Sequence, residues 1–306
     1  MKSRSHAIWK HTWQRLWSVF GLAVLWLLSQ LPRASREALA AGLSSLSLRY
    51  NPRLLRSVAA NIHYALPEYP EAQQQQMQRD YLQHYYRSIL DGARLWSLSA
   101  KQISREVHIH GGEWVSHYLR RGKPVILHVH HTTALEFAAL ALAVRFPIVG
   151  YARATKDPVL NYCIDNTRRR LGVELYHRGD SLRRIISALR RGRVLYYFAD
   201  EDHGPKHSRF LPLFGKPKAT ICGLSRLARQ VDAAVLHCDS WWDAKSGRYQ
   251  TAISPAQPNF PSNDVWHDAL RINQKIEQMI QRNVSQYLWK LEIFKTRPEG
   301  ENSIYT

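Results

Sequence analysis

The sequence predicts an α/β protein in which helices flank a largely parallel central sheet. Short apolar runs rich in β-branched residues recur between residues 125 and 198, and segments with helical periodicity separate them. The 306-residue chain is 45% hydrophobic and 22% charged, which is an ordinary globular composition. A chain of this length and composition can bury a substantial core, so disordered, collagen-like and low-complexity classes are excluded.

The first element is an uncharged run at residues 16–31, LWSVFGLAVLWLLSQL, with basic residues on both sides. A perpendicular membrane span needs about 20 apolar residues, so the run is slightly short. A buried core helix and a signal peptide are the alternatives, but the only A-x-A cleavage candidate nearby, at residues 38–40, lies beyond the run and behind charged residues. Trp17 and Trp26 and the basic flanks favour a membrane-anchoring helix.

The remaining elements follow in order along the chain. We expect residues 1–35 to form a basic amino terminus with the membrane anchor, and residues 36–306 to form one folded domain. Within that domain, strands alternate with helices, which is typical of a parallel sheet. The expected elements are helices over 36–100, a strand at 125–130, a helix at 135–144, a strand at 147–151, a helix at 180–190, a strand at 194–198 and an amphipathic helix at 265–280.

The formal charge of +19 implies acidic partners, for which nucleic acid, anionic lipid and an acidic protein are candidates. The charge is concentrated in two clusters, a local +8 within residues 1–60 and a local +6 within residues 165–193. No helix-turn-helix, RNP-like or zinc-finger pattern is present, which argues against nucleic acid. The three cysteines are odd in number and form no CxxC pair, which suits a reducing compartment.

The residues that carry chemistry follow the predicted strand at 125–130, in the sequence His128-Val129-His130-His131-Thr132-Thr133-Ala134-Leu135-Glu136. Open α/β sheets usually place their sites at the carboxyl ends of strands. On one continuous helix, residues five apart differ by about 140° and do not share a face. With His131 in the loop and Glu136 in the first helical turn, the imidazole can swing back onto the carboxylate. Such a pair is a base with its orienting partner, because the acid fixes the tautomer and stabilises the imidazolium.

Two other interpretations of these residues stay open at this point. Thr133 and Glu136 fit a capping box, in which Glu136 only closes the beginning of a helix, and these residues taken alone favour capping. His128, His130 and His131 could form a zinc cluster, but their spacing is not a standard ligand pattern, so we expect no metal site.

Together with its neighbours, the histidine-x4-acid motif resembles the glycerolipid acyltransferase superfamily. Most of the chain is similar to one branch of it, the bacterial lipid A biosynthesis acyltransferases, which are the lauroyl and myristoyl transferases of late lipid A assembly. The tail is the most specific part, with Gln286-Tyr287-Leu288-Trp289 followed by Phe294-Lys295-Thr296-Arg297-Pro298-Glu299-Gly300. Other matching blocks, in the same order, are Gln30-Leu31-Pro32, Leu66-Pro67-Glu68, Arg153 with Asp157-Pro158, Arg168 with Arg170, Arg178, residues 188–192, Asp200-Glu201-Asp202-His203-Gly204, Pro212-Leu213-Phe214 and Ala219-Thr220. One departure is Lys290-Leu291-Glu292-Ile293, where close relatives carry a histidine and arginines.

The resemblance implies transfer of a fatty acyl chain from acyl carrier protein to a hydroxyl of a lipid A precursor. His131 would take the proton from the acceptor hydroxyl, and Glu136 would orient the imidazole. The cysteines have no partner that suggests a nucleophile, so direct transfer is expected, with no cofactor beyond the acyl carrier protein co-substrate. An acyltransferase acting on a lysophospholipid or another glycolipid is an alternative. A basic membrane- or nucleic-acid-binding protein is a non-enzymatic alternative, which does not explain the ordered motifs.

Candidate substrate-binding residues follow from the acidic acceptor that the resemblance implies. Guanidinium groups bind phosphate bidentately, which points to Arg153, Arg168, Arg170 and Arg178. Asp200 and Asp202 end a predicted strand at the same sheet edge, and we expect them to position arginines or acceptor hydroxyls.

The expected partners are acyl carrier protein, a lipid A precursor and the membrane, with no role for nucleic acid. Basic residues flank residues 16–31 on both sides, and positive charge is typical of the cytoplasmic side of a membrane. The expected location is therefore the bacterial inner membrane, with the catalytic domain facing the cytoplasm.

Overall fold

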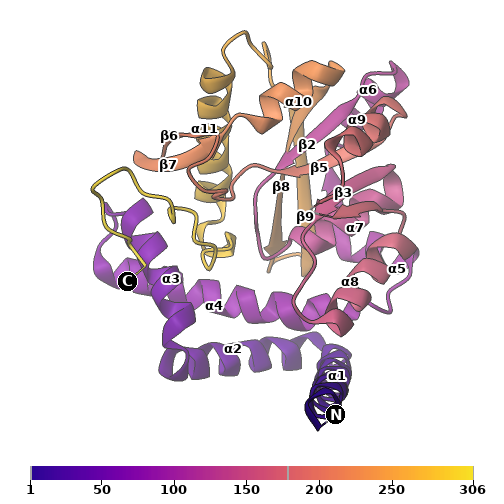
Figure 1. Ribbon diagram of the computed structural model, residues 1–306, viewed down its shortest axis with the longest axis vertical. Coiled ribbons are helices and arrows are strands. Elements are labelled where there is room, and N and C mark those ends of the chain that lie inside the picture. Colours follow the sequence, from indigo (N-terminus) through magenta and orange to yellow (C-terminus); the bar gives the residue numbers. More distant parts are fainter. Residues whose placement is uncertain (1, 178, 306) are drawn as a thin grey trace.

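A seven-stranded sheet forms the centre of the molecule, in the order β1-β9-β8-β2-β5-β3-β4 (Figure 1). A computed structural model describes residues 2–177 and 179–305, with side chains from residue 13 onward. Neighbouring strands are parallel except β8 and β9, which confirms the predicted α/β class with a largely parallel sheet. The strands are β1 (Val107–His110), β2 (Val125–Val129), β3 (Ile148–Ala152), β4 (Glu174–His177), β5 (Val194–Phe198), β8 (Ala234–Asp243) and β9 (Arg248–Ala256).

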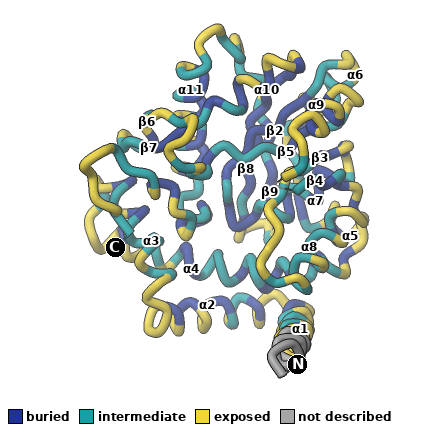
Figure 2. Tube along the Cα trace, viewed as in Figure 1, coloured by how far each residue is buried: buried dark blue, intermediate teal, exposed yellow. Residues whose placement is uncertain are grey.

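Helices cover both faces of this sheet. The helices that follow α1 (Lys2–Ser29) are α2 (Arg33–Tyr50), α3 (Pro52–Ala65), α4 (Glu71–Arg94), α5 (Ala100–Glu106), α6 (Gly112–Arg120), α7 (Leu135–Arg145), α8 (Pro158–Arg170), α9 (Leu182–Arg190), α10 (Gly223–Val231) and α11 (Val265–Arg282), of which α2 packs on α3 and α4. On one face, α9, α10 and α11 bury Ile185, Leu227 and Ile276 in one core cluster. On the other face, α5, α6 and α7 bury side chains that include Ile103 and Phe137 in a second cluster. The strands are accordingly the most deeply buried part of the chain (Figure 2).

The predicted elements between residues 125 and 198 are found with small changes in their bounds. The helix expected from residue 180 begins at Leu182, because the Ser181 hydroxyl caps it by accepting a hydrogen bond from the backbone N–H of Arg183. The antiparallel pair β8–β9 was not predicted. Buried polar residues such as His237 and Asp239 interrupt the apolar pattern of β8 and hide it in the sequence.

A short antiparallel hairpin, β6 (Ser208–Leu213) with β7 (Lys216–Ile221), lies apart from the main sheet. Phe214 and Gly215 connect its strands with φ angles of 53° and 67°. Two consecutive positive φ angles are the geometry of a tight type I′ turn, which a glycine adopts without steric cost. The hairpin carries Lys218 of β7 toward the end of β5.

The amino-terminal segment forms helix α1 (Lys2–Ser29), which packs on α4 and α8. The Ser18 hydroxyl donates to Asp157 Oδ2 at 2.6 Å, and Trp26 Nε1 donates to Ser97 Oγ at 3.2 Å. Across the described residues, we find no helix with the length and apolarity needed to cross a membrane, so the expected membrane-spanning anchor is not supported. Polar Ser29 and Gln30, followed by Pro32, end the apolar run before it reaches the length of a span.

Candidate active site

His131 lies in the loop after β2 and is held by the buried carboxylate of Asp200, which follows the neighbouring strand β5. Asp200 Oδ1 accepts a hydrogen bond from the His131 ring at Nδ1 (2.7 Å), and Asp200 Oδ2 accepts from the His131 backbone N–H (2.8 Å). Because β2 and β5 are parallel neighbours, their carboxyl ends meet at one sheet edge and bring the two residues together. A carboxylate that accepts from Nδ1 leaves Nε2 as the basic nitrogen of the neutral ring.

The surroundings of His131 fix its ring and tune its pKa. The imidazole stacks on the Phe198 ring at 4.1 Å between centroids, and Nε2 lies 3.6 Å from Glu201 Oε1. Burial by itself lowers the pKa of His131, but the carboxylates of Asp200 and Glu201 outweigh burial and raise the pKa above the ordinary value. Burial likewise raises the pKa of Asp200, yet the nearby His131 holds that pKa far below its usual range. Asp200 is therefore ionised and ready to stabilise an imidazolium.

The carboxy-terminal segment after α11 holds the His131 loop in place. The Tyr287 hydroxyl donates to Asp200 Oδ2 at 3.1 Å, which gives this carboxylate a further donor. Two backbone hydrogen bonds pair the segments: the N–H of Leu288 donates to the His131 carbonyl, and the N–H of Thr133 donates to the Gln286 carbonyl, each at 2.9 Å. The most specific motif of the sequence thus lies directly against the loop that carries the histidine.

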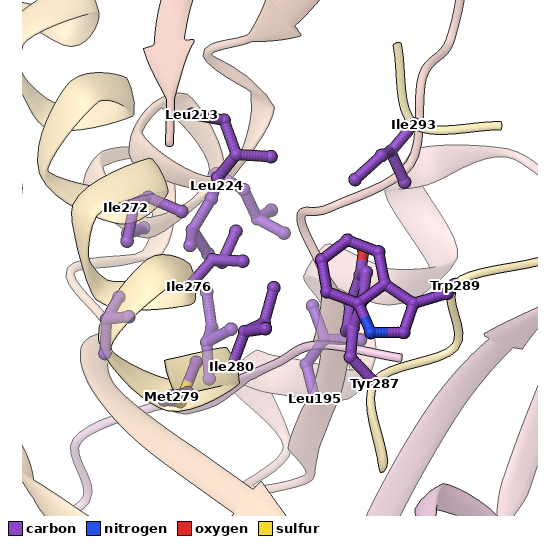
Figure 3. Packing of buried hydrophobic residues seen from close by; sticks show 14 of the residues in the cluster. Leu195, Leu213, Leu224, Ile272, Ile276, Met279, Ile280, Tyr287, Trp289 and Ile293 are labelled. Carbon is purple, nitrogen blue, oxygen red and sulfur yellow. The ribbon is translucent and has the colours of Figure 1, made fainter. Parts of the chain in front are cut away.

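The same segment is anchored in the core of the molecule. Tyr287 and Trp289 are almost fully buried and pack in the cluster that also contains Ile276 and Ile280 of α11 (Figure 3). The Asn61 side chain donates to the Trp289 carbonyl at 2.7 Å and so ties the segment to α3. These contacts make the position of Tyr287 beside Asp200 a property of the folded core.

The expected hydrogen bond between Glu136 and His131 is not found among the described residues, where each side chain has another partner. The Glu136 carboxylate accepts two hydrogen bonds from the Arg168 guanidinium, at 2.8 and 2.7 Å. Glu136 lies in the first turn of α7 and pairs with Arg168 of α8, whereas His131 turns toward β5 and Asp200. The bidentate pair raises the pKa of Arg168 despite the opposing effect of its burial.

The alternatives of capping and metal binding are not found either. Ala134 occupies the capping position of α7, and no side-chain hydrogen bond caps this helix. His128 Nδ1 lies 2.8 Å from His237 Nδ1, and His130 Nε2 lies 3.6 Å from Asp239 Oδ1, so the three neighbouring histidines turn to different partners. Within residues 2–177 and 179–305, no group of three or more His, Cys, Asp or Glu residues is arranged to hold a metal ion.

The other predicted site residues are distributed between the cavity and the framework. Arg153 is exposed and lines a cavity of about 900 Å³ that lies next to the His131 loop. Arg170 donates to the backbone carbonyls of Leu98 and Leu95 at 2.8 and 3.1 Å, and so holds the segment after α4 against α8. Arg178 lies outside the described residues.

Asp202 lines the same cavity, and it also fixes the carboxy-terminal segment. Its carboxylate accepts from the backbone N–H and the hydroxyl of Thr296, at 2.7 and 2.8 Å. It accepts a further hydrogen bond from the backbone N–H of Gly204 at 2.8 Å. With its oxygens satisfied in this way, Asp202 is held as part of the cavity wall.

Sequence reasoning missed two residues that shape the site. Tyr287 was identified only as part of a family motif, and Lys218 was not identified at all. Lys218 is fully buried in β7, where its Nζ donates to the Glu201 carbonyl at 3.3 Å. Burial lowers the pKa of Lys218, against the opposing effect of Asp200, Asp202 and Glu201. Lys218 stands between Pro217 and Ala219, and this sequence gave no sign that the lysine is buried.

The cavity of about 900 Å³ is lined by Phe198 and Glu201, both of which contact His131. One part of its lining is apolar and the other is charged, a combination that suits an amphiphilic substrate. The apolar residues include Leu182, Ile185, Leu195, Ile221, Leu227, Leu291 and Ile293, and the charged residues are Arg153, Asp180, Glu201, Asp202, Glu292 and Lys295. A narrower slot shares Tyr151, Ala152, Tyr196 and Phe198 with this cavity and contains the Glu136–Arg168 pair.

A histidine held by a buried carboxylate, at the carboxyl edge of a parallel sheet and next to an amphiphilic cavity, is an arrangement typical of α/β enzymes that use an imidazole base. Comparison with known proteins identifies the family of the chain. The chain belongs to the bacterial lipid A biosynthesis acyltransferases, whose family model matches residues 5–296. The protein is therefore an acyltransferase.

Individual relatives match over nearly the whole chain. The lipid A biosynthesis lauroyltransferase of Escherichia coli K12 is 29% identical over 95% of this chain and 95% of its own length. A lipid A biosynthesis acyltransferase of Haemophilus influenzae is 27% identical over 97% of this chain and 94% of its own length. The Escherichia coli K12 myristoyltransferase of the same pathway is 27% identical over 95% of this chain and 91% of its own length. The two Escherichia coli relatives are named for different acyl groups, and all three share the class of reaction.

Proposed function

We propose that this enzyme transfers a fatty acyl chain from the thioester of acyl carrier protein to a hydroxyl group of a lipid A precursor. The observation that carries the proposal is the His131–Asp200 pair beside the 900 Å³ amphiphilic cavity. The family supports lipid A acylation, the apolar lining of the cavity suits an acyl chain, and Arg153 and Lys295 in the lining can pair with an anionic group of the acceptor.

The proposed reaction is a direct transfer with His131 as general base. Nε2 of His131 takes the proton of the acceptor hydroxyl while the oxygen attacks the thioester carbonyl. A carbon–oxygen bond forms, the carbon–sulfur bond breaks, and the proton passes from the imidazolium to the departing thiolate. Asp200 stabilises the imidazolium through Nδ1. Burial raises the pKa of both Cys163 and Cys238, which disfavours the thiolate that a covalent route would need.

The arginines have separate proposed roles. Arg153, exposed on the cavity lining, is our candidate contact for an anionic group of the acceptor. Arg168 is engaged by Glu136, so we propose that the pair positions the first turn of α7 and the shared slot wall, and that Glu136 acts on catalysis through this position.

Purified protein in detergent, incubated with acyl carrier protein thioesters and a lipid A precursor that carries a free hydroxyl group, tests this proposal. Wild-type protein should form a product that is one acyl chain heavier by mass spectrometry. His131→Ala should form none while keeping the wild-type circular dichroism spectrum. A wild-type protein that acylates a lysophospholipid but leaves the lipid A precursor unchanged would overturn the proposed acceptor.

We also propose that the protein acts at the inner surface of the bacterial inner membrane, bound through α1 and α2. Large apolar side chains of both helices face solvent, and they include Trp17 (66% exposed), Phe20 (61%) and Leu46 (54%). Basic residues of the same region include Arg15, Arg49 and Arg53. Apolar side chains accompanied by basic ones are typical of helices that lie in the plane of an anionic lipid surface.

A further inference from the structure

A basic surface lies on α9 and α10, which are neighbouring helices on one face of the sheet. We call it the α9–α10 basic face, and it consists of Arg183, Arg184 and Arg190 of α9 with Arg226 and Arg229 of α10, all exposed. Their apolar neighbours Ile185 and Leu227 point into the core, which leaves the guanidinium groups outside.

Few carboxylates neutralise this surface. Asp180 pairs with Arg184 at 3.2 Å, and Glu174 is engaged beyond the end of α9 by Arg191 and Arg193, each at 2.9 Å. In the described part of the chain, neither an ion pair nor a hydrogen bond to a carboxylate involves Arg183, Arg190 or Arg226. These three cations therefore present a positive charge that the protein itself does not balance, and a partner of opposite charge would be attracted to it.

The α9–α10 basic face adjoins the cavity. Leu182 and Ile185 of α9 and Leu227 of α10 line the cavity from within, so the helices that carry the arginines also form part of its wall. Arg183 stands in the first turn of α9, next to the exposed cavity residue Leu182. A partner docked on this face would therefore lie beside the opening through which a tethered chain could reach His131.

The position of this face distinguishes a soluble partner from a lipid surface. In Figure 1, α9 and α10 lie toward one end of the longest axis, whereas α1 and α2 lie toward the other. A flat bilayer that contacts the exposed apolar side chains of α1 and α2 would not reach α9 and α10 at the same time. The charge at this end fits an acidic protein that approaches from the aqueous side.

We propose that the α9–α10 basic face docks the acidic acyl carrier protein and directs its acyl thioester into the cavity. This inference rests on the proposed function, since it names the surface on which the proposed donor binds. Complementary charge mainly accelerates encounter and fixes orientation, so its loss should raise the KM for the protein-borne donor more than it lowers kcat.

The test is the double variant Arg183→Glu/Arg226→Glu, assayed with two donors. Both changes place an acidic residue in the first half of a helix, where the helix dipole favours it. With acyl carrier protein thioester, KM should rise about tenfold or more, because like charges now oppose the donor. With the same acyl group on pantetheine, which lacks the acidic protein, KM and kcat should stay at wild-type values.

The matched control is Lys101→Glu/Arg120→Glu, which makes the same change of net charge with exposed residues of α5 and α6, on the opposite face of the sheet. It should leave the KM for both donors unchanged. An Arg183→Glu/Arg226→Glu variant with a wild-type KM for acyl carrier protein thioester would overturn the docking surface and leave the proposed function intact. A wild-type enzyme that uses the pantetheine thioester but not the carrier protein would instead overturn the proposed donor.

Discussion

At the scale of single residues, the site depends on which carboxylate holds His131. Asp200 accepts from both the ring and the backbone of His131, so Asp200→Asn should lower kcat/KM roughly 10²- to 10⁴-fold, as for the loss of other base-orienting carboxylates. Asp200 raises the pKa of His131, so that pKa should fall in the variant. The neutral base then persists to lower pH, and the acidic limb of the kcat/KM profile should move to lower pH. An unmoved limb would contradict this role.

For a change at Glu136 we expect the acidic limb of the pH profile to stay where it is. Glu136 pairs with Arg168 and, among the described residues, forms no hydrogen bond or ion pair with His131, so Glu136→Gln should lower kcat while the acidic limb of the pH profile stays in place. Arg168→Gln should have a similar effect, and the double variant should be little worse than either single variant, because both residues act through one pair. A shifted limb in Glu136→Gln would show instead that Glu136 orients the imidazole during the reaction.

At the scale of elements, the carboxy-terminal segment after α11 connects the His131 loop to β8. The Gln286 side chain accepts from the Trp242 N–H at 2.6 Å and donates to the Trp242 carbonyl at 2.9 Å, in a buried setting. Gln286→Ala should lower the free energy of unfolding by about 1–3 kcal/mol for each group left unpaired. Denaturant unfolding measures the change, and Gln278→Ala, at an exposed position of α11, is the control that should remain near wild type.

Part of the fold and of the site could be predicted from the sequence, element by element. The strands at 125–130 and 194–198 were recognisable because they are apolar and bounded by turns, and both His131 and Asp200 were identified as site residues at their ends. The wrong step was to pair His131 with the acid nearest in sequence. The alternation of strands with helices did not reveal that β2 and β5 are adjacent, and this adjacency decides the partner. Tyr287 comes from far along the chain, so no local pattern could place it beside Asp200.

At the scale of the whole molecule, the exposed apolar side chains of α1 and α2 predict binding to a lipid surface. Trp17→Ser/Phe20→Ser removes two of the most exposed rings, each of which would stabilise binding by roughly 1.5–3 kcal/mol if fully buried in lipid. Partition onto anionic phospholipid vesicles, measured by sedimentation, should fall at least about tenfold. Phe210→Ser, which removes an exposed ring on β6, should bind vesicles like wild type. Equal binding by both variants would contradict this surface.

The path of the chain has a consequence for biosynthesis. Every strand of the sheet precedes α11, yet the Tyr287 hydroxyl on Asp200 and the Leu288 N–H on the His131 carbonyl come from residues that follow it. During translation, a nascent chain can therefore complete its sheet before it has the contacts that fix the histidine loop. We therefore expect a product that terminates between α11 and Tyr287 to form the sheet but to lack these contacts to the His131 loop and to Asp200.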